Sequence, residues 1–201
     1  MMPGIYDGEG RVIQFTNKAG GGSGTPIDSV ISSSPASSAT GKPCDRCGYP
    51  SGLGGVVSSC IDCFVQDGDL CLFEYDVSTP YFLTRLRGGT CSTASSDSPK
   101  VVLCRARYLL ENDFGDYSLF SINCEDFAIY CKTGQILKGP NRIGQTCLFS
   151  VLMAVPAFII APALVFASPL ISMHLSRLNT ENLRLKQRKI RVEELSQYLS
   201  S

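Results

Sequence analysis

NCEDFAIYCKTG, at residues 123–134, is the stretch that says most about the fold and the chemistry of this chain. Asn123 is a favourable N-cap, so we expect a helix that begins near Cys124. A cysteine there lies at the positive end of the helix dipole, which favours thiolate over thiol. Because the thiolate is the nucleophile, the position suits covalent acyl chemistry. The alternative is a half-buried structural cysteine at the start of an amphipathic helix.

The N-terminal part of the chain has the pattern of short strands. Residues 4–6 and 12–15 are expected to form two strands, joined by a turn in the glycine-containing residues 7–10. Residues 17–42 are rich in Gly, Ser, Pro and Thr and are read as a flexible insertion in a loop. Farther along, the alternation at residues 70–75 predicts another strand.

The region before residue 123 predicts one more helix. Ser98-Pro99 is suited to open a helix over residues 100–112, with a buried stripe made by Leu103, Ala106 and Leu110. Strands early in the chain followed by helices indicate an α+β domain.

Ten cysteines stand out in the composition, and four of them have the spacing of a metal site. Two CxxC pairs are separated by twelve residues, close to a zinc-ribbon pattern, and two such knuckles complete a tetrahedron of thiolates. The four are Cys44, Cys47, Cys60 and Cys63. We expect structural Zn²⁺, because a closed four-thiolate site has no vacant position for a substrate. Two unrelated cysteine pairs, or a redox CxxC, are the alternatives.

Five further cysteines have no metal spacing, and we interpret them as small core hydrophobes. They are Cys71, Cys91, Cys104, Cys131 and Cys147.

Residues 147–173 are uncharged and mostly apolar. A straight helix of that length extends about 40 Å, enough to cross a hydrocarbon core of about 30 Å. Pro156, Pro162 and Pro169 interrupt it, although membrane helices tolerate proline better than soluble ones. We therefore expect a membrane-associated protein. Zinc thiolates need reducing conditions, so the main domain is expected to face a reducing compartment, on the cytosolic side or in an organelle.

The charge of the chain and its distribution argue against a nucleic-acid partner. The chain carries 18 basic and 18 acidic side chains, and no basic patch with interleaved aromatic residues occurs in the sequence, which argues against nucleic acid. The tail, residues 174–201, has an excess of basic residues, and leucine or valine recurs seven apart at positions 178, 185, 192 and 199. We expect a basic amphipathic helix that lies on a surface.

Three segments together resemble a known family. They are RARYLLENDFGDYSLFSINCEDFAIYCKTG from Arg105 to Gly134, RGGTC at residues 87–91, and the CxxC-containing insertion. The chain is similar to the plant branch of the lecithin:retinol acyltransferase-like family, also called the NC domain. The resemblance covers roughly residues 4–146.

That resemblance implies a circularly permuted papain-like (NlpC-type) domain over residues 1–146, with an insertion at 17–66. The hydrophobic segment 147–173 and the tail 174–201 follow. It also implies a thiol enzyme that moves acyl groups of membrane lipid through a thioester at Cys124. Family enzymes place a general-base histidine where this chain has Met2, and a second polar residue where it has Gln14. Gln14 can orient an imidazole, but methionine accepts no proton.

Two functional classes follow, and whether the chain is an enzyme stays open between them. In the first, it is a lipid acyltransferase- or phospholipase-like protein with Cys124 as nucleophile, impaired because the base histidine is absent. The chain's one histidine, His174, matches no catalytic position of the family. Family domains begin with several dozen residues, including a strand, ahead of the stretch that matches residues 4–6, and this sequence lacks them. We therefore expect either an N-terminally shortened version or a chain that has abandoned catalysis. In the second class, it is a non-catalytic, zinc-stapled, membrane-associated protein that binds lipid or protein.

Overall fold

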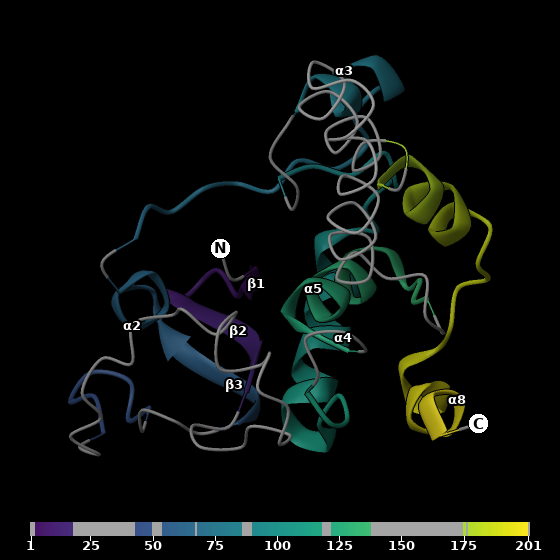
Figure 1. Cartoon of the computed structure of the whole chain (residues 1–201). Coiled ribbons are helices and arrows are strands. Elements are labelled where there is room, and N and C mark those ends of the chain that lie inside the picture. The colour runs from purple at the N-terminus through teal and green to yellow at the C-terminus, as the bar shows by residue number, and fades with distance from the viewer. Residues whose placement is uncertain are drawn as a thin grey trace, which may run out of the picture.

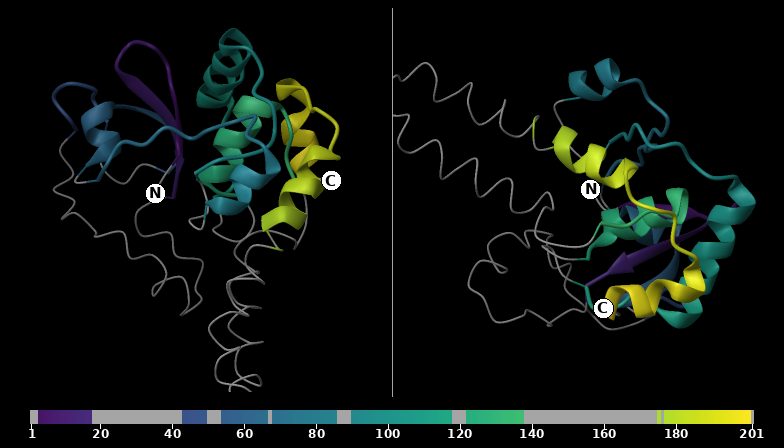
Figure 2. Two further views of the ribbon diagram at one scale, coloured as in Figure 1. Left: turned by 90° about the horizontal axis from the view of Figure 1, so that it is seen from above. Right: turned by 90° about the vertical axis from the view of Figure 1, so that its right-hand side faces the viewer.

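The computed structural model describes residues 3–17, 43–49, 54–66, 68–85, 90–117, 122–137, 175 and 177–200. These ranges form a mixed α+β fold, as the order of strands and helices predicted. Figures 1 and 2 show three layers: a small sheet, then helices α4 (Pro99–Asn112) and α5 (Cys124–Thr133), then residues 177–200. The helices α4 and α5 therefore have partners on two sides.

The sheet is antiparallel, with β2 in the middle. Its strands are β1 (Gly4–Tyr6), β2 (Arg11–Thr16) and β3 (Gly55–Cys60). The turn between β1 and β2 is held by the Asp7 carboxylate, which accepts hydrogen bonds from the backbone N–H groups of Glu9 and Arg11. The two strands expected from the sequence are confirmed. The sequence reading missed β3, because its glycines and serines belong to a segment interpreted as a metal-binding insertion.

Helix α4 begins where the sequence predicted, with Ser98 as N-cap and Pro99 in the first turn. Its buried stripe is made by Val102, Ala106 and Leu109. The expected stripe was therefore wrong by one position at two of its three residues. Leu103 and Leu110 lie at the edge of the buried face and are only partly covered.

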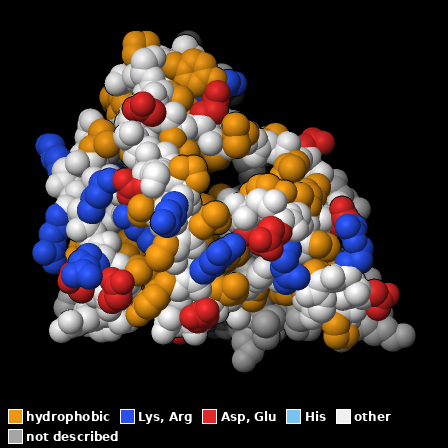
Figure 3. Space-filling model, turned by 180° about the vertical axis from the view of Figure 1, so that it is seen from behind, with side chains coloured by type: hydrophobic (Ala, Val, Ile, Leu, Met, Phe, Trp, Pro, Cys, Tyr) orange, Lys and Arg blue, Asp and Glu red, His pale blue; other side chains and the backbone are white. Residues whose placement is uncertain are grey.

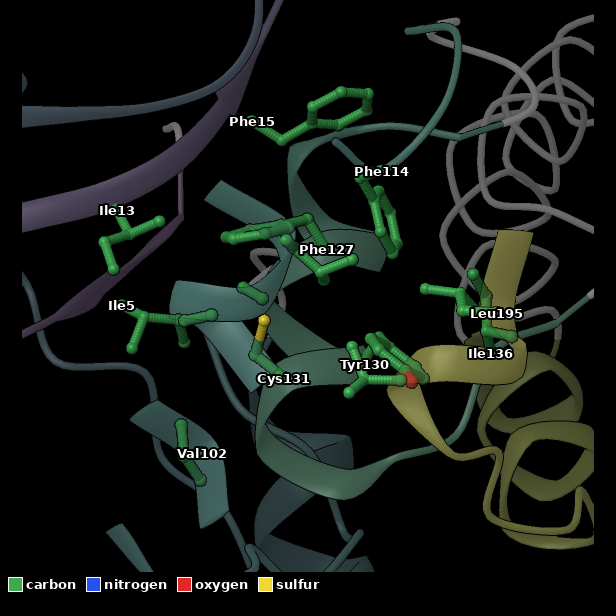
Figure 4. Close-up of a cluster of buried hydrophobic side chains, with 14 of the residues drawn as sticks. Ile5, Ile13, Phe15, Val102, Phe114, Phe127, Tyr130, Cys131, Ile136 and Leu195 are labelled. Atoms are coloured by element: carbon green, nitrogen blue, oxygen red, sulfur yellow. The ribbon is translucent and has the colours of Figure 1, made fainter. Parts of the chain in front are cut away.

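Aromatic side chains from the sheet and the helices fill the core (Figure 4). The Phe15 ring meets Phe114 edge-on with centroids 5.3 Å apart, and Phe114 meets Phe127 in the same way at 5.5 Å. Such edge-to-face pairs contribute about 0.5–1.5 kcal/mol each beyond the area that they bury. These ring contacts hold α5 against the sheet and thereby position the N-terminal end of α5 in space.

Residues 177–200, expected to be a surface-lying tail, contribute to this core. Ile190, Val192 and Leu195 are buried in it. Tyr130 donates its hydroxyl to the carbonyl of Ile190 at 3.0 Å, and the N–H of Ile190 bonds the carbonyl of Gly134 at 2.8 Å. The chain thus returns to α5 after the hydrophobic segment. The final turns are η1 (Val192–Glu194) and α8 (Leu195–Ser200).

The strand expected at residues 70–75 does not form. Glu74 makes an isolated parallel bridge with Cys91, and the neighbouring residues 70 and 72 are exposed. Two short helices were not expected: α2 (Ile61–Val65) and α3 (Thr79–Thr84). A single bridge supplies too few ladder hydrogen bonds to hold an alternating segment as a strand.

The membrane-associated location expected from residues 147–173 is corrected by the structure. Within the described ranges, no helix is both long enough and apolar enough to cross a bilayer. The 14 residues of α4 extend only about 21 Å, against the roughly 30 Å of a hydrocarbon core. Residues 147–173 themselves, with His174, lie outside the described residues.

Candidate functional site

Cys124 is the first residue of α5, as predicted, and its side chain is half-buried. Asn123 caps the helix: its side-chain oxygen accepts hydrogen bonds from the N–H groups of Glu125 at 2.9 Å and Asp126 at 3.2 Å. The Asp126 carboxylate accepts in turn from the N–H of Asn123 at 3.1 Å, which completes a capping box. The cysteine is therefore held at a rigid helix start.

Tyr117 is the side chain that reaches the thiol. Its hydroxyl donates a hydrogen bond to Sγ of Cys124 over 3.9 Å. The Tyr117 ring packs beside Phe15 with centroids 5.1 Å apart, so the aromatic core positions it. Sequence reasoning missed Tyr117, because it precedes the helix by seven residues and belongs to no periodic element.

The surroundings of Cys124 hold its proton on sulfur. Burial raises the pKa of the Cys124 thiol above its usual value, and the charge of Glu125 raises it further. The hydrogen bond from Tyr117 and the N–H groups of residues 124 and 125 act in the opposite direction without overcoming burial. Tyr117 cannot serve as the base, because burial also raises the pKa of its hydroxyl above the ordinary value of a tyrosine. The thiol is thus predominantly protonated at neutral pH.

Gln14, expected to orient an imidazole, lies on the other face of the sheet. Ile13 and Phe15 belong to the core beside α5, and successive side chains of a strand alternate between faces. Gln14 donates from Nε2 to Oγ of Ser59 at 3.2 Å, while its buried Oε1 has no hydrogen-bond partner among the described residues. The structure therefore does not bring Gln14 to Cys124. Met2 and His174 lie outside the described residues.

The four cysteines with metal spacing come together. One sulfur from each of Cys44, Cys47, Cys60 and Cys63 lies within 4.8 Å of every other, and Cys47 and Cys63 are 3.7 Å apart. The first pair sits in a tight turn where the N–H of Gly48 bonds the carbonyl of Cys44 at 2.7 Å. Gly48 has φ +66°, a left-handed conformation that suits glycine. The second pair spans the end of β3 and the start of α2.

The donor set fits a tetrahedral metal ion. Zinc–sulfur bonds of about 2.3 Å place the four sulfurs of a tetrahedral site about 3.8 Å apart, close to the spacing seen here. Although burial opposes it, hydrogen bonds from the backbone of Cys60 and Tyr49 and from neighbouring thiols lower the pKa of Cys47 to about 6. Burial and the neighbouring thiols raise the pKa of Cys63.

The other cysteines divide between core and surface. Cys91 and Cys131 are buried, as expected of small core hydrophobes, whereas Cys71 and Cys104 are exposed and the interpretation was wrong for them. Cys147 lies outside the described residues.

The surface charge of the described residues is mixed. On the face in Figure 3, basic and acidic side chains are interspersed.

Comparisons with known proteins agree with the resemblance seen in the motifs. A profile of the lecithin retinol acyltransferase family, abbreviated LRAT, matches residues 3–137. Protein LEAD-SENSITIVE 1 of Arabidopsis thaliana is 46% identical over 145 residues, which is 71% of this chain and 55% of that protein. The chain thus spans about half the length of this curated plant relative. No solved structure matches the chain.

The matched region contains the sheet, α4, α5 and the thiol at the start of α5, and it extends over the cysteine cluster. The chain therefore belongs to the LRAT family, in agreement with the plant-type motifs of its sequence.

Proposed function

We propose that this chain is an LRAT-type thiol protein in which Cys124 accepts an acyl group from a lipid ester, at a slow rate because none of the described residues acts as a general base on its sulfur. The observation that carries the proposal is the placement of Cys124 at the capped start of α5 with the Tyr117 hydroxyl on its sulfur. The family match supplies the acyl chemistry and the lipid as substrate class. The permuted papain-like topology is proposed on the same basis.

The covalent step forms a C–S and an O–H bond and breaks a C–O and an S–H bond. Sγ of Cys124 attacks the carbonyl carbon of the ester, a C–S bond forms, and the ester C–O bond breaks with the alcohol leaving. The thiol proton ends on the leaving oxygen. Water or a second acceptor then takes the acyl group and returns the thiol. The N–H groups of residues 124 and 125 stabilise negative charge on sulfur at the start of the step.

Removal of the thiol proton from Cys124 limits this step. Base assistance typically contributes about 10²–10⁴-fold to a rate. Neither Tyr117 nor Gln14 supplies it: the first is a donor to sulfur with a raised pKa, and the second lies on the far face of the sheet. We therefore expect slow acylation that speeds up as pH rises, because the thiolate fraction of Cys124 rises with it.

Trapping the thioester tests the proposal. The purified chain is incubated with a short-chain phospholipid and digested under acidic conditions that preserve thioesters, and the peptides are read by mass spectrometry. We expect the acyl mass on the peptide that contains Cys124, more at pH 9 than at pH 7, and none in Cys124→Ala. Cys104→Ala is the matched control, since Cys104 is an exposed cysteine outside the site. Acylation that persists in Cys124→Ala would contradict the proposal.

For the cysteine cluster we propose structural Zn²⁺ held by Cys44, Cys47, Cys60 and Cys63, which pins the end of β3 to the preceding turn. The test is stoichiometric metal in the purified, reduced chain. The similar plant protein is named for sensitivity to lead, a soft cation that thiolates also bind, so Pb²⁺ is the competitor to include in a zinc titration.

The second candidate is a non-catalytic, zinc-stapled protein that uses the fold to bind lipid or protein. The raised pKa of Cys124 favours it, because it describes a resting thiol rather than an activated one. If the thioester is never trapped while the isolated chain still retains a phospholipid, this second function replaces the first.

A further inference from the structure

The helical residues 177–185 bury a polar face, whereas a surface helix usually buries an apolar one. Their inward positions follow a helical repeat and are all polar or charged, and they are Arg177, Thr180, Glu181 and Arg184. Leu185, by contrast, is 44% exposed. A surface helix normally turns its apolar stripe to the core. A helix that buries charge must find a matching polar receptor, since an unpaired buried charge is costly.

The receptor is the segment 92–94, which follows the bridge between Glu74 and Cys91. One oxygen of the Glu181 carboxylate accepts four hydrogen bonds there. Their donors are Oγ of Ser92 (2.5 Å), N–H of Thr93 (2.7 Å), Oγ1 of Thr93 (3.1 Å) and N–H of Ala94 (3.3 Å). The other oxygen pairs with Nη1 of Arg184 at 3.2 Å. Five donors thus converge on one carboxylate.

The carboxylate and most of its donors are buried, which favours a negatively charged group at this place. Glu181 is 4% exposed, Ser92 and Ala94 are each 1% exposed, and Arg184 is 5% exposed. Charge-assisted hydrogen bonds are roughly twice as strong as neutral ones, and leaving such donors empty and dry costs more than the bonds contribute. The backbone of the receptor is held independently, because the N–H of Ser92 bonds the carbonyl of Glu74 at 2.8 Å. The backbone N–H groups of Thr93 and Ala94 are therefore positioned by contacts other than Glu181, and the Ala94 N–H also donates to Oγ of Ser92 at 3.1 Å.

We propose that Ser92, Thr93, Ala94 and Arg184 form a carboxylate-binding site whose resident ligand is Glu181, so that the helix 177–185 is a latch held by occupancy of this site. A small free carboxylate takes the same place when the Glu181 side chain is removed. The latch has a second contact at its start, where Arg177 donates to the carbonyl of Arg85 and lies over the Phe82 ring. None of the buried positions of the helix 177–185 carries an apolar side chain, so we expect its docking to depend strongly on that one carboxylate.

Amide hydrogen exchange on the full chain tests the latch, because exchange of residues 177–185 reports how often the helix opens. Glu181→Ala is expected to speed that exchange by about 100-fold or more, since several charge-assisted bonds are lost together. Sodium formate is expected to slow it again, relative to sodium chloride of equal ionic strength, because a ligand of the docked state stabilises that state. Glu193→Ala is the matched control: Glu193 is an exposed glutamate that meets Arg191 over 3.7 Å.

Three results would overturn the proposal. The first is exchange in Glu181→Ala that formate leaves unchanged, and the second is equal protection of Glu193→Ala by formate. The third is equal protection by inorganic phosphate, which would overturn the assignment to a carboxylate. Ser92→Ala keeps the test decisive if the alanine variant at 181 does not fold. It removes one donor from an otherwise intact site, so exchange of 177–185 is expected to rise about tenfold, and an unchanged rate would equally overturn the latch.

Discussion

Cysteines occupy two regions of this protein with opposite chemistry. In the cluster of Cys44, Cys47, Cys60 and Cys63, sulfurs gather within 4.8 Å, and the pKa of Cys47 is lowered to about 6 while that of Cys63 is raised. At the start of α5, Cys124 lies apart from that cluster, half-buried, and its pKa is raised. Both regions place a cysteine at the end of a regular element, Cys60 at the end of β3 and Cys124 at the start of α5. The neighbours decide whether sulfur gives up its proton.

The contrast shows which neighbours matter. Burial opposes the thiolate in both places, so burial alone does not distinguish them. Around Cys47, backbone N–H groups and other thiols outweigh burial. Beside Cys124, the N–H groups of residues 124 and 125 and a long hydrogen bond from Tyr117 do not, and the Glu125 carboxylate adds repulsion. A helix start is therefore insufficient to activate a thiol when burial of the thiol and a neighbouring carboxylate both favour the protonated form.

Removing a metal ligand should have the largest effect on this contrast. Cys47→Ala is expected to abolish stoichiometric metal binding and to lower stability by several kcal/mol, because binding of a structural zinc is coupled to folding of its ligands. Elemental analysis together with thermal unfolding measures both. Cys104→Ala, an exposed cysteine outside the cluster, should retain the metal and the melting temperature. Equal metal content in the two variants would show that the cluster is not the metal site.

Removing the cap of α5 should have the next largest effect. Asn123→Ala deletes the acceptor for two N–H groups and breaks the capping box, so we expect a loss of about 1–2 kcal/mol in the free energy of unfolding. Urea denaturation measures it. Asn112→Ala is the control, since Asn112 is exposed at the end of α4 and donates only to the carbonyl of Tyr108. A cap variant no less stable than this control would contradict the assigned role.

The sequence predicted the parts of the fold that depend on local signals. Ser98-Pro99 and Asn123 are strong helix starts, and the turn after β1 carries glycines where φ is positive, so these elements were found. The CxxC spacing found the cluster for the same reason, because each knuckle is a local structure.

The parts that failed depend on contacts between distant residues. Tyr117 reaches Cys124 only because Phe15 holds its ring, and no local pattern encodes that. The polar inward face of 177–185 is explained only by the donors of segment 92–94, almost ninety residues earlier in the chain. The leucine repeat of the tail suggested the opposite face, because periodicity reads hydrophobicity and cannot read a hydrogen-bonded receptor.

A smaller effect is expected from neutralising the carboxylate next to the thiol. The Glu125 charge raises the pKa of Cys124, so Glu125→Gln should lower that pKa and speed alkylation of Cys124 by iodoacetamide at pH 8. For each unit by which the pKa falls, the thiolate fraction rises about tenfold while its nucleophilicity falls about threefold, which leaves roughly a threefold gain. Peptide-resolved mass spectrometry separates Cys124 from the other cysteines. Glu111→Gln, on the exposed side of α4, should leave the rate unchanged, and slower alkylation in Glu125→Gln would refute the electrostatic account.

The smallest effect, in the opposite direction, is expected from Tyr117→Phe. This variant keeps the ring that packs on Phe15 and removes only the hydroxyl that lowers the pKa of Cys124, so the pKa should rise and alkylation at pH 8 should slow. Because the bond spans 3.9 Å, we expect a change of about twofold, below that of a well-formed charge-assisted bond. The measurement is the rate of Cys124 alkylation from pH 7 to 10, where the rise of the rate with pH should shift to higher pH. If Tyr117→Phe instead speeds alkylation, the hydroxyl shields the thiol rather than stabilising its anion, and the contrast between the two cysteine regions would rest on access to sulfur rather than on proton affinity.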